Sequence, residues 1–389
     1  MTDILILSAT RTAIGSFGGA LSSMPPIDIA SQAARSAIAQ AGVDPAQIGQ
    51  VVFGHVINTE PRDMYLARVA AMNAGIPETT PAMNVNRLCG SGAQAIVSAV
   101  QMLQLGDATV ALAGGAECMS RSPHILSAAR FGQKTGDTQI LDMMIGALTC
   151  PFGTGHMGIT AENVAAQYGI TRDAQDEFAL LSQTRAAAAI ASGHFVSQIT
   201  AIEAVTKKGS IHIAQDEHPK PTSLAALATL RPAFQKEGTI TAGNASGIND
   251  GAAAVVLARA DALGALKPRA RIMGYALAGV DPKVMGLGPI PAVQLLCRKL
   301  GLRPADFDVV ESNEAFAAQA LAVTQSLGLD PARVNPNGGA IALGHPVGAT
   351  GTMLVVKALY ELERTGGKTA LITMCIGGGQ GIALAIERI

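Results

Sequence analysis

The stretch NVNRLCGSGAQAIVSAVQMLQLGDATVALAGG, residues 84–115, contains an order of features that returns near the C-terminus. An Asn-Val-Asn segment precedes Cys89, and small and apolar residues at helical spacing predict a helix from Ser91 to Leu105. A strand is predicted over residues 109–112, and two glycines follow it. A helix and a strand are therefore expected directly after Cys89.

The same order of features is found in residues 335–378. There an Asn-Pro-Asn segment precedes His345, a helix is predicted from Thr350 to Leu362, and a strand over residues 369–373 again leads to paired glycines. Residues 42–55 also match residues 301–313 once one residue is dropped. Self-similarity of this kind predicts that the chain is built from two copies of one α/β unit.

The pattern outside these repeats predicts layered α/β packing. Strands rich in β-branched residues alternate with alanine-rich amphipathic helices such as residues 27–41 and 291–300, which favours largely parallel sheets. Between about residues 119 and 246 prolines break this pattern, and two helices, 160–168 and 171–192, look solvent-facing. We therefore expect an N-terminal half of residues 1–265 with an inserted loop domain at about 119–246, and a C-terminal half of residues 266–389.

Composition excludes several classes of function. The 389 residues have a net charge of −1, 49% are hydrophobic and only 15% are charged, so the chain has no basic field for nucleic acid or anionic lipid. No signal peptide and no apolar run of about 18 residues is present, so the sequence predicts a cytoplasmic protein without a membrane span. The five cysteines are too far apart for a zinc or redox pair, so no metal is expected and the thiols are predicted to be free.

Three residues in glycine-rich surroundings suggest covalent acyl transfer. Cys89 precedes a predicted helix, whose unpaired N–H groups and dipole favour a nucleophilic thiolate. His345 lies in a glycine-rich run and could accept the proton of Cys89, while Cys375 ends a strand before three glycines whose N–H groups could bind an oxyanion. The alternative is that both cysteines are buried structural thiols and that the histidine is satisfied by a carbonyl in the core.

With these residues in place, the chain is similar from end to end to the thiolase family, in particular to acetyl-CoA acetyltransferases and bacterial β-ketothiolases. The fold that this resemblance implies is an α/β architecture layered α-β-α-β-α, with two pseudo-duplicated halves and an inserted loop domain. The matching motifs are residues 86–92, 156–163, 241–247 and 313–318, together with the two C-terminal glycine-rich runs around His345 and Cys375.

The resemblance implies a reversible ping-pong Claisen condensation of two acetyl-CoA to acetoacetyl-CoA and CoA. Cys89 would carry the acyl group and His345 would accept its proton, while Cys375 would remove a proton from the α-carbon of acetyl-CoA. Two oxyanions need two donor sets. The resemblance assigns one set to His345 with a water held by Asn313, and the other to the backbone N–H groups of Cys89 and Gly377.

The resemblance also implies acyl-CoA as the small-molecule partner, no permanently bound cofactor, and a homotetramer arranged as a dimer of dimers. No Walker-type phosphate loop is present, so the nucleotide end of CoA is expected near cations such as Lys207, Lys208 or Lys220. The residues implied to contact CoA or the substrate are Leu148, His156, Met157, Leu230, Phe234, Ala242, Ser246, Met285, Ala315 and Phe316.

Several alternatives stay open at this stage. The enzyme could be a 3-ketoacyl-CoA thiolase of broad chain length that acts mainly in thiolysis, or a non-catalytic partner of an acyl carrier. A 3-ketoacyl synthase typically has two histidines where this chain offers His345 and Cys375. An oxidoreductase would need a dinucleotide-binding G-x-G-x-x-G turn between a strand and a helix, whereas the glycines at 377–381 precede a final strand.

Overall fold

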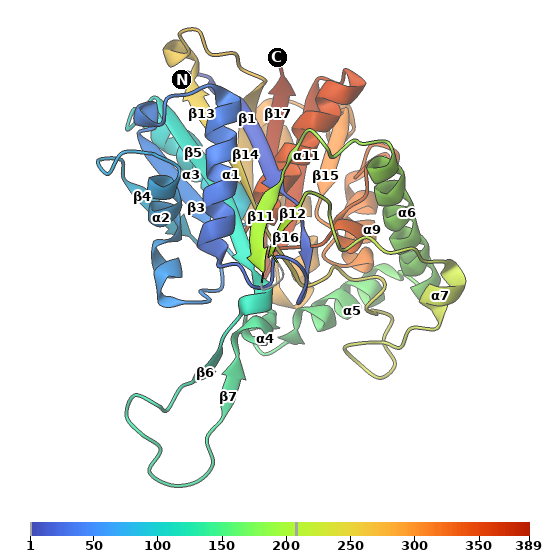
Figure 1. The fold of residues 1–389 in the computed structure, drawn as a ribbon. Coiled ribbons are helices and arrows are strands. Elements are labelled where there is room, and N and C mark those ends of the chain that lie inside the picture. The colour runs from blue at the N-terminus through green and yellow to red at the C-terminus, as the bar shows by residue number, and fades with distance from the viewer. Residues whose placement is uncertain (1, 207–208) are drawn as a thin grey trace.

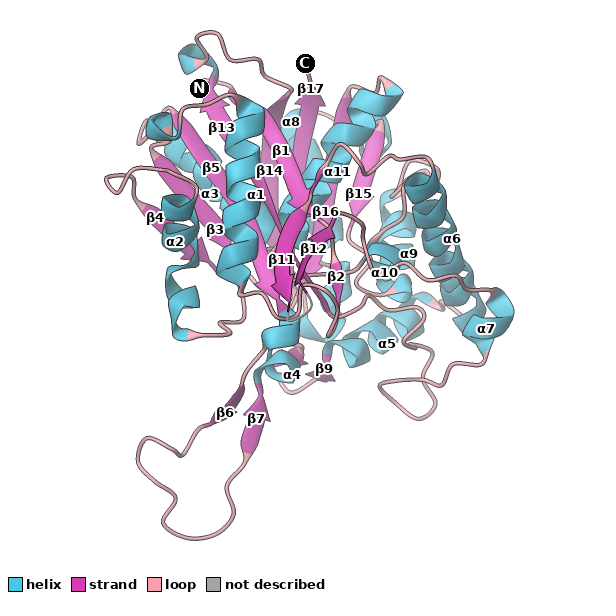
Figure 2. Ribbon diagram, in the orientation of Figure 1, coloured by secondary structure: helices cyan, strands magenta, loops and turns pink. Residues whose placement is uncertain are grey.

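A large mixed sheet runs through the computed structural model, which describes residues 2–206 and 209–389 (Figures 1 and 2). Its strands follow the order β15-β16-β17-β14-β1-β13-β5-β3-β4, with β2 and β10 paired beside β13 and β1. The strands of the N-terminal half are β1 (Ile4–Thr12), β2 (Gly15–Ser16), β3 (Gln50–Gly54), β4 (Ala82–Val85), β5 (Val110–Cys118), β10 (Ile199–Thr200) and β13 (Asn249–Arg259). Those of the C-terminal half are β14 (Ala270–Gly279), β15 (Val309–Ser312), β16 (Thr369–Ile376) and β17 (Gln380–Arg388).

Each half of the chain contributes its own half-sheet, and a short ladder joins the two. Strands β1 and β14 pair only through Leu5 with Arg271 and Ile6 with Ala270. Among the described strands, the parallel pairs are β1 with β10, β3 with β4 and β5, and β15 with β16, and the other pairs are antiparallel. The prediction of largely parallel sheets was therefore wrong. In the C-terminal half the reason is local, because the short turn between β16 and β17 can join only antiparallel strands.

The helices and half-sheets form the five layers that were predicted. Helices α1 (Pro26–Ala41) and α2 (Leu66–Asn73) cover the outer face of the first half-sheet, and α8 (Pro289–Leu300) and α9 (Ala317–Leu327) cover that of the second. Helices α3 (Ser91–Leu105) and α11 (Thr350–Thr365) lie between the half-sheets, where the largest apolar core joins residues of both (Figure 1).

The two central helices approach so closely at their first turns that only glycine fits there. A Cβ on Gly92 would lie 2.8 Å from the Thr352 nitrogen, and a Cβ on Gly351 would overlap the Ala93 backbone. Ser91-Gly92 and Thr350-Gly351 are the helix starts that the repeat made equivalent, and the structure confirms both starts. The two copies therefore meet at corresponding glycines.

Most of the inserted region lies below and to the right of the two half-sheets in Figure 2. Its hairpin of β6 and β7 projects away from the body (Figure 1). The remaining elements, including α10 from the C-terminal half, are β6 (His124–Leu126), β7 (Ile140–Asp142), α4 (Met143–Ala147), β8 (Thr149–Cys150), β9 (Gly155–His156), α5 (Met157–Tyr168), α6 (Arg172–Ala191), β11 (Ile202–Thr206), β12 (Gly209–Ile213), α7 (Leu224–Ala228) and α10 (Ala340–Leu343).

Helices α5 and α6 are less exposed than their sequences indicate. Met157 and Ala161 of α5 pack into an apolar cluster with Cys375 and Phe316, and α6 buries Ala179 against Ile341. The expectation of solvent-facing helices was wrong for these faces, since α5 and α6 cover the loops of the C-terminal half. Along residues 2–206 and 209–389, none of the helices is both long enough and apolar enough to cross a bilayer.

Candidate active site

Cys89 projects from a strained turn between β4 and α3. The preceding Leu88 has a φ of 46°, a left-handed conformation that is costly for a residue with a branched side chain. Two side chains hold the turn, because Asn86 Oδ1 accepts the Leu88 N–H at 2.9 Å and Ser91 Oγ donates to the Leu88 carbonyl at 2.7 Å. Hydrogen bonds around the turn thus fix the position of the thiol.

The surroundings of the half-buried Cys89 favour its thiol over its thiolate. Burial raises the pKa of Cys89 to about 11, and the negative charge of Glu117 adds to the rise, although hydrogen bonds from the N–H groups of Gly377 and Cys89 itself lower it. The predicted preference for thiolate was therefore wrong for this state. The helix start supplies favourable donors, but the loss of hydration outweighs them.

Cys375 lies in the same buried region, at the end of β16. Burial raises the pKa of its thiol, and a negative charge on the neighbouring Cys89 would raise it further. In the turn that follows, a Cβ on Gly377 would lie 3.0 Å from Leu88 Cδ1 and 3.2 Å from Met157 Cε, so both side chains would have to shift to admit it. The Gly377 N–H lowers the pKa of the Cys89 thiol.

His345 is held as a neutral imidazole with a defined tautomer. Thr350 donates its hydroxyl hydrogen to the Pro346 carbonyl at 2.9 Å, so its oxygen is left to accept from His345 Nδ1 at 2.7 Å. This network assigns the ring proton to Nδ1 and leaves Nε2 free to accept a proton. Burial lowers the pKa of His345 to about 4, which keeps the ring neutral near pH 7.

Asn313 follows β15 and reaches the site through His345. Its Nδ2 lies 3.5 Å from His345 Nε2, while its buried Oδ1 has no hydrogen-bond partner within the described residues. The next residue, Glu314, fixes this loop by accepting hydrogen bonds from Ser182 Oγ at 2.7 Å and Asn335 Nδ2 at 2.8 Å. Asn313 is therefore presented by a loop that buried polar contacts hold in place.

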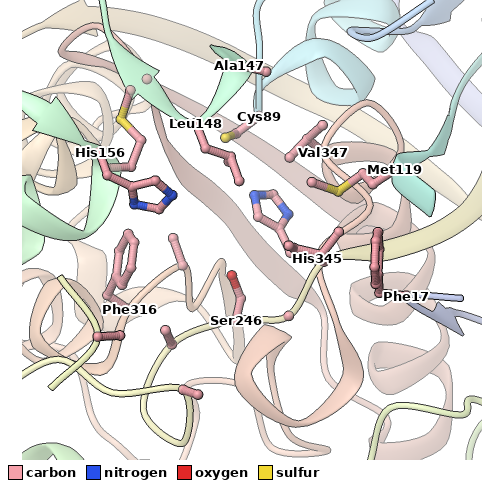
Figure 3. A pocket seen from close by; sticks show the side chains of 18 of the residues that line it. Phe17, Cys89, Met119, Ala147, Leu148, His156, Ser246, Phe316, His345 and Val347 are labelled. Atoms are coloured by element: carbon pink, nitrogen blue, oxygen red, sulfur yellow. The ribbon is translucent and has the colours of Figure 1, made fainter. Parts of the chain in front are cut away.

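Cys89, His345, Cys375 and Gly377 line one cavity of about 500 Å³, into which the labelled Cys89 and His345 project (Figure 3), whereas Asn313 is not part of its wall. His156 stacks on Phe234 with ring centroids 4.6 Å apart, and Phe316 meets Phe234 edge to face at 6.2 Å, so three predicted residues form an aromatic wall. The predicted residues that line the cavity are Cys89, Leu148, His156, Met157, Phe234, Ala242, Ser246, Met285, Ala315, Phe316, His345, Cys375 and Gly377.

Leu230 is the predicted contact that the cavity does not include. Its side chain packs at Gly243, close to Leu227, and the residue is 37% exposed. Of the three candidate cations, Lys220 lines the cavity, whereas Lys207 and Lys208 lie outside the described residues. Lys220 is accompanied there by His218, whose pKa burial lowers to about 4.

Several residues of the cavity wall were missed. Val56 directly follows His55, which ends a repeated segment, and Val347 directly follows the Gly-His-Pro turn. Because both neighbours were already marked in the sequence, these two residues could have been predicted. Phe17 and Met119 carry no comparable signal. They reach the cavity only because β13 pairs with both β2 and β5, which brings the segments that flank these two strands together.

Comparisons with known proteins cover the whole chain. Two family models match it, "Thiolase, N-terminal domain" over residues 4–261 and "Thiolase, C-terminal domain" over residues 266–388. The chain is 55% identical to the beta-ketothiolase BktB of Cupriavidus necator, over 100% of this chain and 99% of that protein. It is 49% identical to the acetyl-CoA acetyltransferase of Escherichia coli over the full length of both.

Solved structures of the same length have the same fold. The acetyl-CoA acetyltransferase of Bacillus anthracis and the human mitochondrial 3-ketoacyl-CoA thiolase each superpose with a TM-score of 0.98 at 44% identity, and each comparison covers 100% of this chain and 99% of the other.

Proposed function

The chain belongs to the thiolase family and is an acyltransferase, an acetyl-CoA C-acetyltransferase, and we propose that it works by a ping-pong mechanism through an acyl-Cys89 intermediate. One observation carries this proposal. Cys89, His345, Cys375 and Gly377 line one cavity, and the N–H groups of Gly377 and Cys89 lower the pKa of the Cys89 thiol. CoA and acetyl-CoA enter as substrates, and no step requires a resident cofactor or metal.

In the first half-reaction, the Cys89 sulfur attacks the thioester carbon of acetyl-CoA. Because the thiol has a pKa of about 11 and the imidazole one of about 4, the proton stays on sulfur until attack begins and then passes to His345 Nε2. The N–H groups of Cys89 and Gly377 stabilise the negative oxygen of the tetrahedral intermediate. The bond to the CoA sulfur then breaks, and His345 returns the proton to the departing thiolate.

In the second half-reaction, His345 Nε2 takes the thiol proton of Cys375, and the resulting thiolate removes a proton from the methyl carbon of a second acetyl-CoA. Burial raises the pKa of the Cys375 thiol, so its thiolate is a strong base and is suited to a weak carbon acid. The protonated His345, with a water held by Asn313, stabilises the enolate oxygen. The enolate carbon bonds to the acyl carbon, the bond to the Cys89 sulfur breaks, and His345 gives its proton to that sulfur.

The reverse reaction provides the first test. We would measure CoA-dependent cleavage of acetoacetyl-CoA, 3-ketohexanoyl-CoA and 3-ketodecanoyl-CoA by the wild type and by Cys89→Ala. Cys297→Ala, which removes a thiol from the core between α8 and the second half-sheet, is the matched control. Cleavage that Cys297→Ala retains and Cys89→Ala loses supports the proposal, whereas cleavage that survives Cys89→Ala rejects it.

Chain length separates the two thiolase alternatives. Cleavage of acetoacetyl-CoA alone supports an acetoacetyl-CoA thiolase, whereas comparable rates on all three substrates support the broad chain-length alternative. The cavity wall contains the apolar side chains of Ile145, Leu148 and Met285. An alkyl chain could pack on this surface without leaving polar groups unpaired, which supports the broad chain-length thiolase as a second candidate.

We also propose that the enzyme is a cytoplasmic homotetramer, a dimer of dimers, with functional halves at residues 1–265 and 266–389. Two separate apolar surfaces support the assembly. One is the projecting hairpin, with Phe131 at 88% exposure, and the other adjoins the edge strand β4, with Met64 at 62% and Tyr65 at 65%. In light scattering, Phe131→Ser should convert tetramers to dimers, and a variant that remains tetrameric would exclude the hairpin from the interface.

A further inference from the structure

A buried carboxylate lies beside the catalytic loops without being part of the cavity wall. Glu117 is near the end of β5 and has no exposed surface. Its two oxygens accept backbone N–H groups from Val56 at 3.1 Å, Ile57 at 3.1 Å and Gly348 at 3.0 Å. His55 Nδ1 lies 3.4 Å from Oε1, the oxygen that also accepts from Ile57. The three backbone neighbours are N–H donors, a pattern that favours the ionised carboxylate, while burial raises the pKa of Glu117.

The strand register makes Glu117 and His55 the counterparts of two catalytic residues. In the first half Gly54 pairs with Gly115, and in the second half Ser312 pairs with Thr373. His55 directly follows Gly54, as Asn313 directly follows Ser312. Glu117 comes two residues after Gly115, as Cys375 comes two residues after Thr373. The antiparallel neighbours agree, because Glu117 pairs with Gly251 of β13 just as Cys375 pairs with Gly381 of β17.

The peptide of Gly348 is held between this carboxylate and the first half-sheet. Glu117 accepts its N–H, while a Cβ on Gly54 would lie 2.7 Å from its carbonyl oxygen and a Cβ on Gly115 would overlap that oxygen. Gly348 comes three residues after His345 and two residues before the first residue of α11, Thr350. A displacement of this peptide therefore moves the turn that carries the catalytic imidazole.

We propose that Glu117, oriented by His55, is a positioning residue for His345. The first half has no catalytic base at this position, and its Glu117 instead anchors the loop of the second half that carries His345. His55 takes part by donating from Nδ1 to the Ala116 carbonyl at 2.9 Å, next to the carboxylate. The proposal deepens the proposed function and rests on it. The charge of Glu117 also acts on Cys89, because it raises the pKa of that thiol.

The test compares Glu117→Gln with a buried carboxylate that makes similar contacts elsewhere. Asp63 is fully buried and accepts the N–H groups of Thr59 at 2.6 Å and Glu60 at 3.1 Å, but it touches neither the loop of His345 nor the cavity. Asp63→Asn is therefore the matched control. In Glu117→Gln the amide NH2 faces backbone N–H donors, so the loop that carries His345 should shift. We expect kcat for acetoacetyl-CoA cleavage to fall by roughly 100-fold, with KM for CoA little changed.

A second readout separates positioning from a general loss of structure. Alkylation of Cys89 by iodoacetamide, followed against pH, should shift to lower pH in Glu117→Gln, because a charge that disfavours the thiolate has been removed. Asp63→Asn should keep the wild-type profile. Should Glu117→Gln fail to fold, His55→Ala tests the same anchor: kcat should fall by about tenfold, and His55→Asn, whose amide can donate to the Ala116 carbonyl, should recover most of it.

The outcomes distinguish the inference from the proposed function. A wild-type enzyme that cleaves none of the 3-ketoacyl-CoA substrates overturns the proposed function, and the positioning role with it. An active wild type whose Glu117→Gln variant keeps kcat within about threefold of Asp63→Asn, or keeps the wild-type alkylation profile, overturns the positioning role alone.

Discussion

The two halves of the molecule share a scaffold but differ in chemistry at equivalent positions. In each half a central helix begins against the other half, at Ser91 in the first and at Thr350 in the second. In each half a pair of parallel strands also ends at the equivalent position of the repeat. At that level the second half presents Cys375 and Asn313, whereas the first presents Glu117 and His55. A pair that includes the proposed base Cys375 thus corresponds to a pair whose hydrogen bonds go to backbone groups.

This difference indicates what duplication provides. The repeated backbone brings two sets of loops together at one place between the half-sheets, which fixes where chemistry can occur. The side chains then determine which half acts and which half supports. Each of the following experiments removes or tests one element of this asymmetry.

The largest effect should come from removing the base of the second half. Cys375→Ala leaves Cys89 and His345 in place, so acyl transfer to Cys89 should still occur, while proton removal from carbon is lost. We expect kcat for condensation to fall by about 10⁴-fold, at the upper end of what a general base contributes. Mass spectrometry should find acylated Cys89 after incubation with acetyl-CoA.

Cys118→Ala is the control in the other half, because Cys118 is a buried thiol next to Glu117 that donates to the Leu21 carbonyl at 3.8 Å and does not line the cavity. Condensation by this variant should stay near the wild-type rate. If Cys375→Ala condenses acetyl-CoA as fast as Cys118→Ala does, the division of labour between the halves is contradicted.

A second experiment tests whether Cys89 and His345, one from each half, form an ion pair at rest. With a thiol pKa of about 11 and an imidazole pKa of about 4, the sulfur is protonated and the ring neutral near pH 7. Deprotonation therefore increases with pH, and alkylation of Cys89 should accelerate about tenfold per pH unit, or about 100-fold from pH 7 to pH 9. Peptide mapping identifies the alkylated thiol.

A thiolate–imidazolium pair predicts the opposite profile. In that case the alkylation rate would already be at a plateau around neutral pH, since both groups would have completed their titration at lower pH. Such a plateau would support the prediction, made from the position of Cys89 before a helix, that its sulfur is a thiolate.

The sequence located the duplication and the catalytic candidates because both depend on local features. Helix starts, paired glycines and the residues between them recur at fixed distances, and Cys89, His345 and Cys375 all lie within such segments. Strand direction could not be predicted, since the pairing of β1 with β13 joins segments separated by residues 13–248, which include the whole inserted region. The protonation state of Cys89 depends on burial by residues distant in sequence, and the role of Glu117 depends on Gly348 in the other half.

A third prediction concerns the contact between the halves. Gly351→Ala would place a methyl group into the Ala93 backbone, so α3 and α11 must separate or tilt, and the free energy of unfolding should fall by about 1–3 kcal/mol. Gly146→Ala is the control, because nothing lies within 4 Å of its added Cβ. Urea unfolding of both variants measures the difference, and equal midpoints would show that the central helices tolerate the wider spacing.

The smallest expected effect is on the orientation of His345, and it tests whether the second half depends on its own helix start as well as on Glu117. Thr350→Val removes the oxygen that accepts from His345 Nδ1 at 2.7 Å while keeping the shape of the side chain. The ring then loses the contact that fixes its proton on Nδ1, so Nε2 is less often free to accept the proton of Cys89. We expect kcat to fall by about tenfold, the cost of one buried hydrogen bond, with KM for CoA unchanged.

Thr352→Val is the matched control for this variant. Thr352 lies two residues further along α11, is fully buried and donates to the Gly92 carbonyl at 3.1 Å, but it has no hydrogen bond with His345. Thr350→Ser keeps the hydroxyl and should retain most of the activity. If Thr350→Val and Thr352→Val lose activity equally, the loss belongs to the packing of the central helices; if only Thr350→Val is slow and Thr350→Ser recovers, the hydroxyl at the start of α11 orients the base.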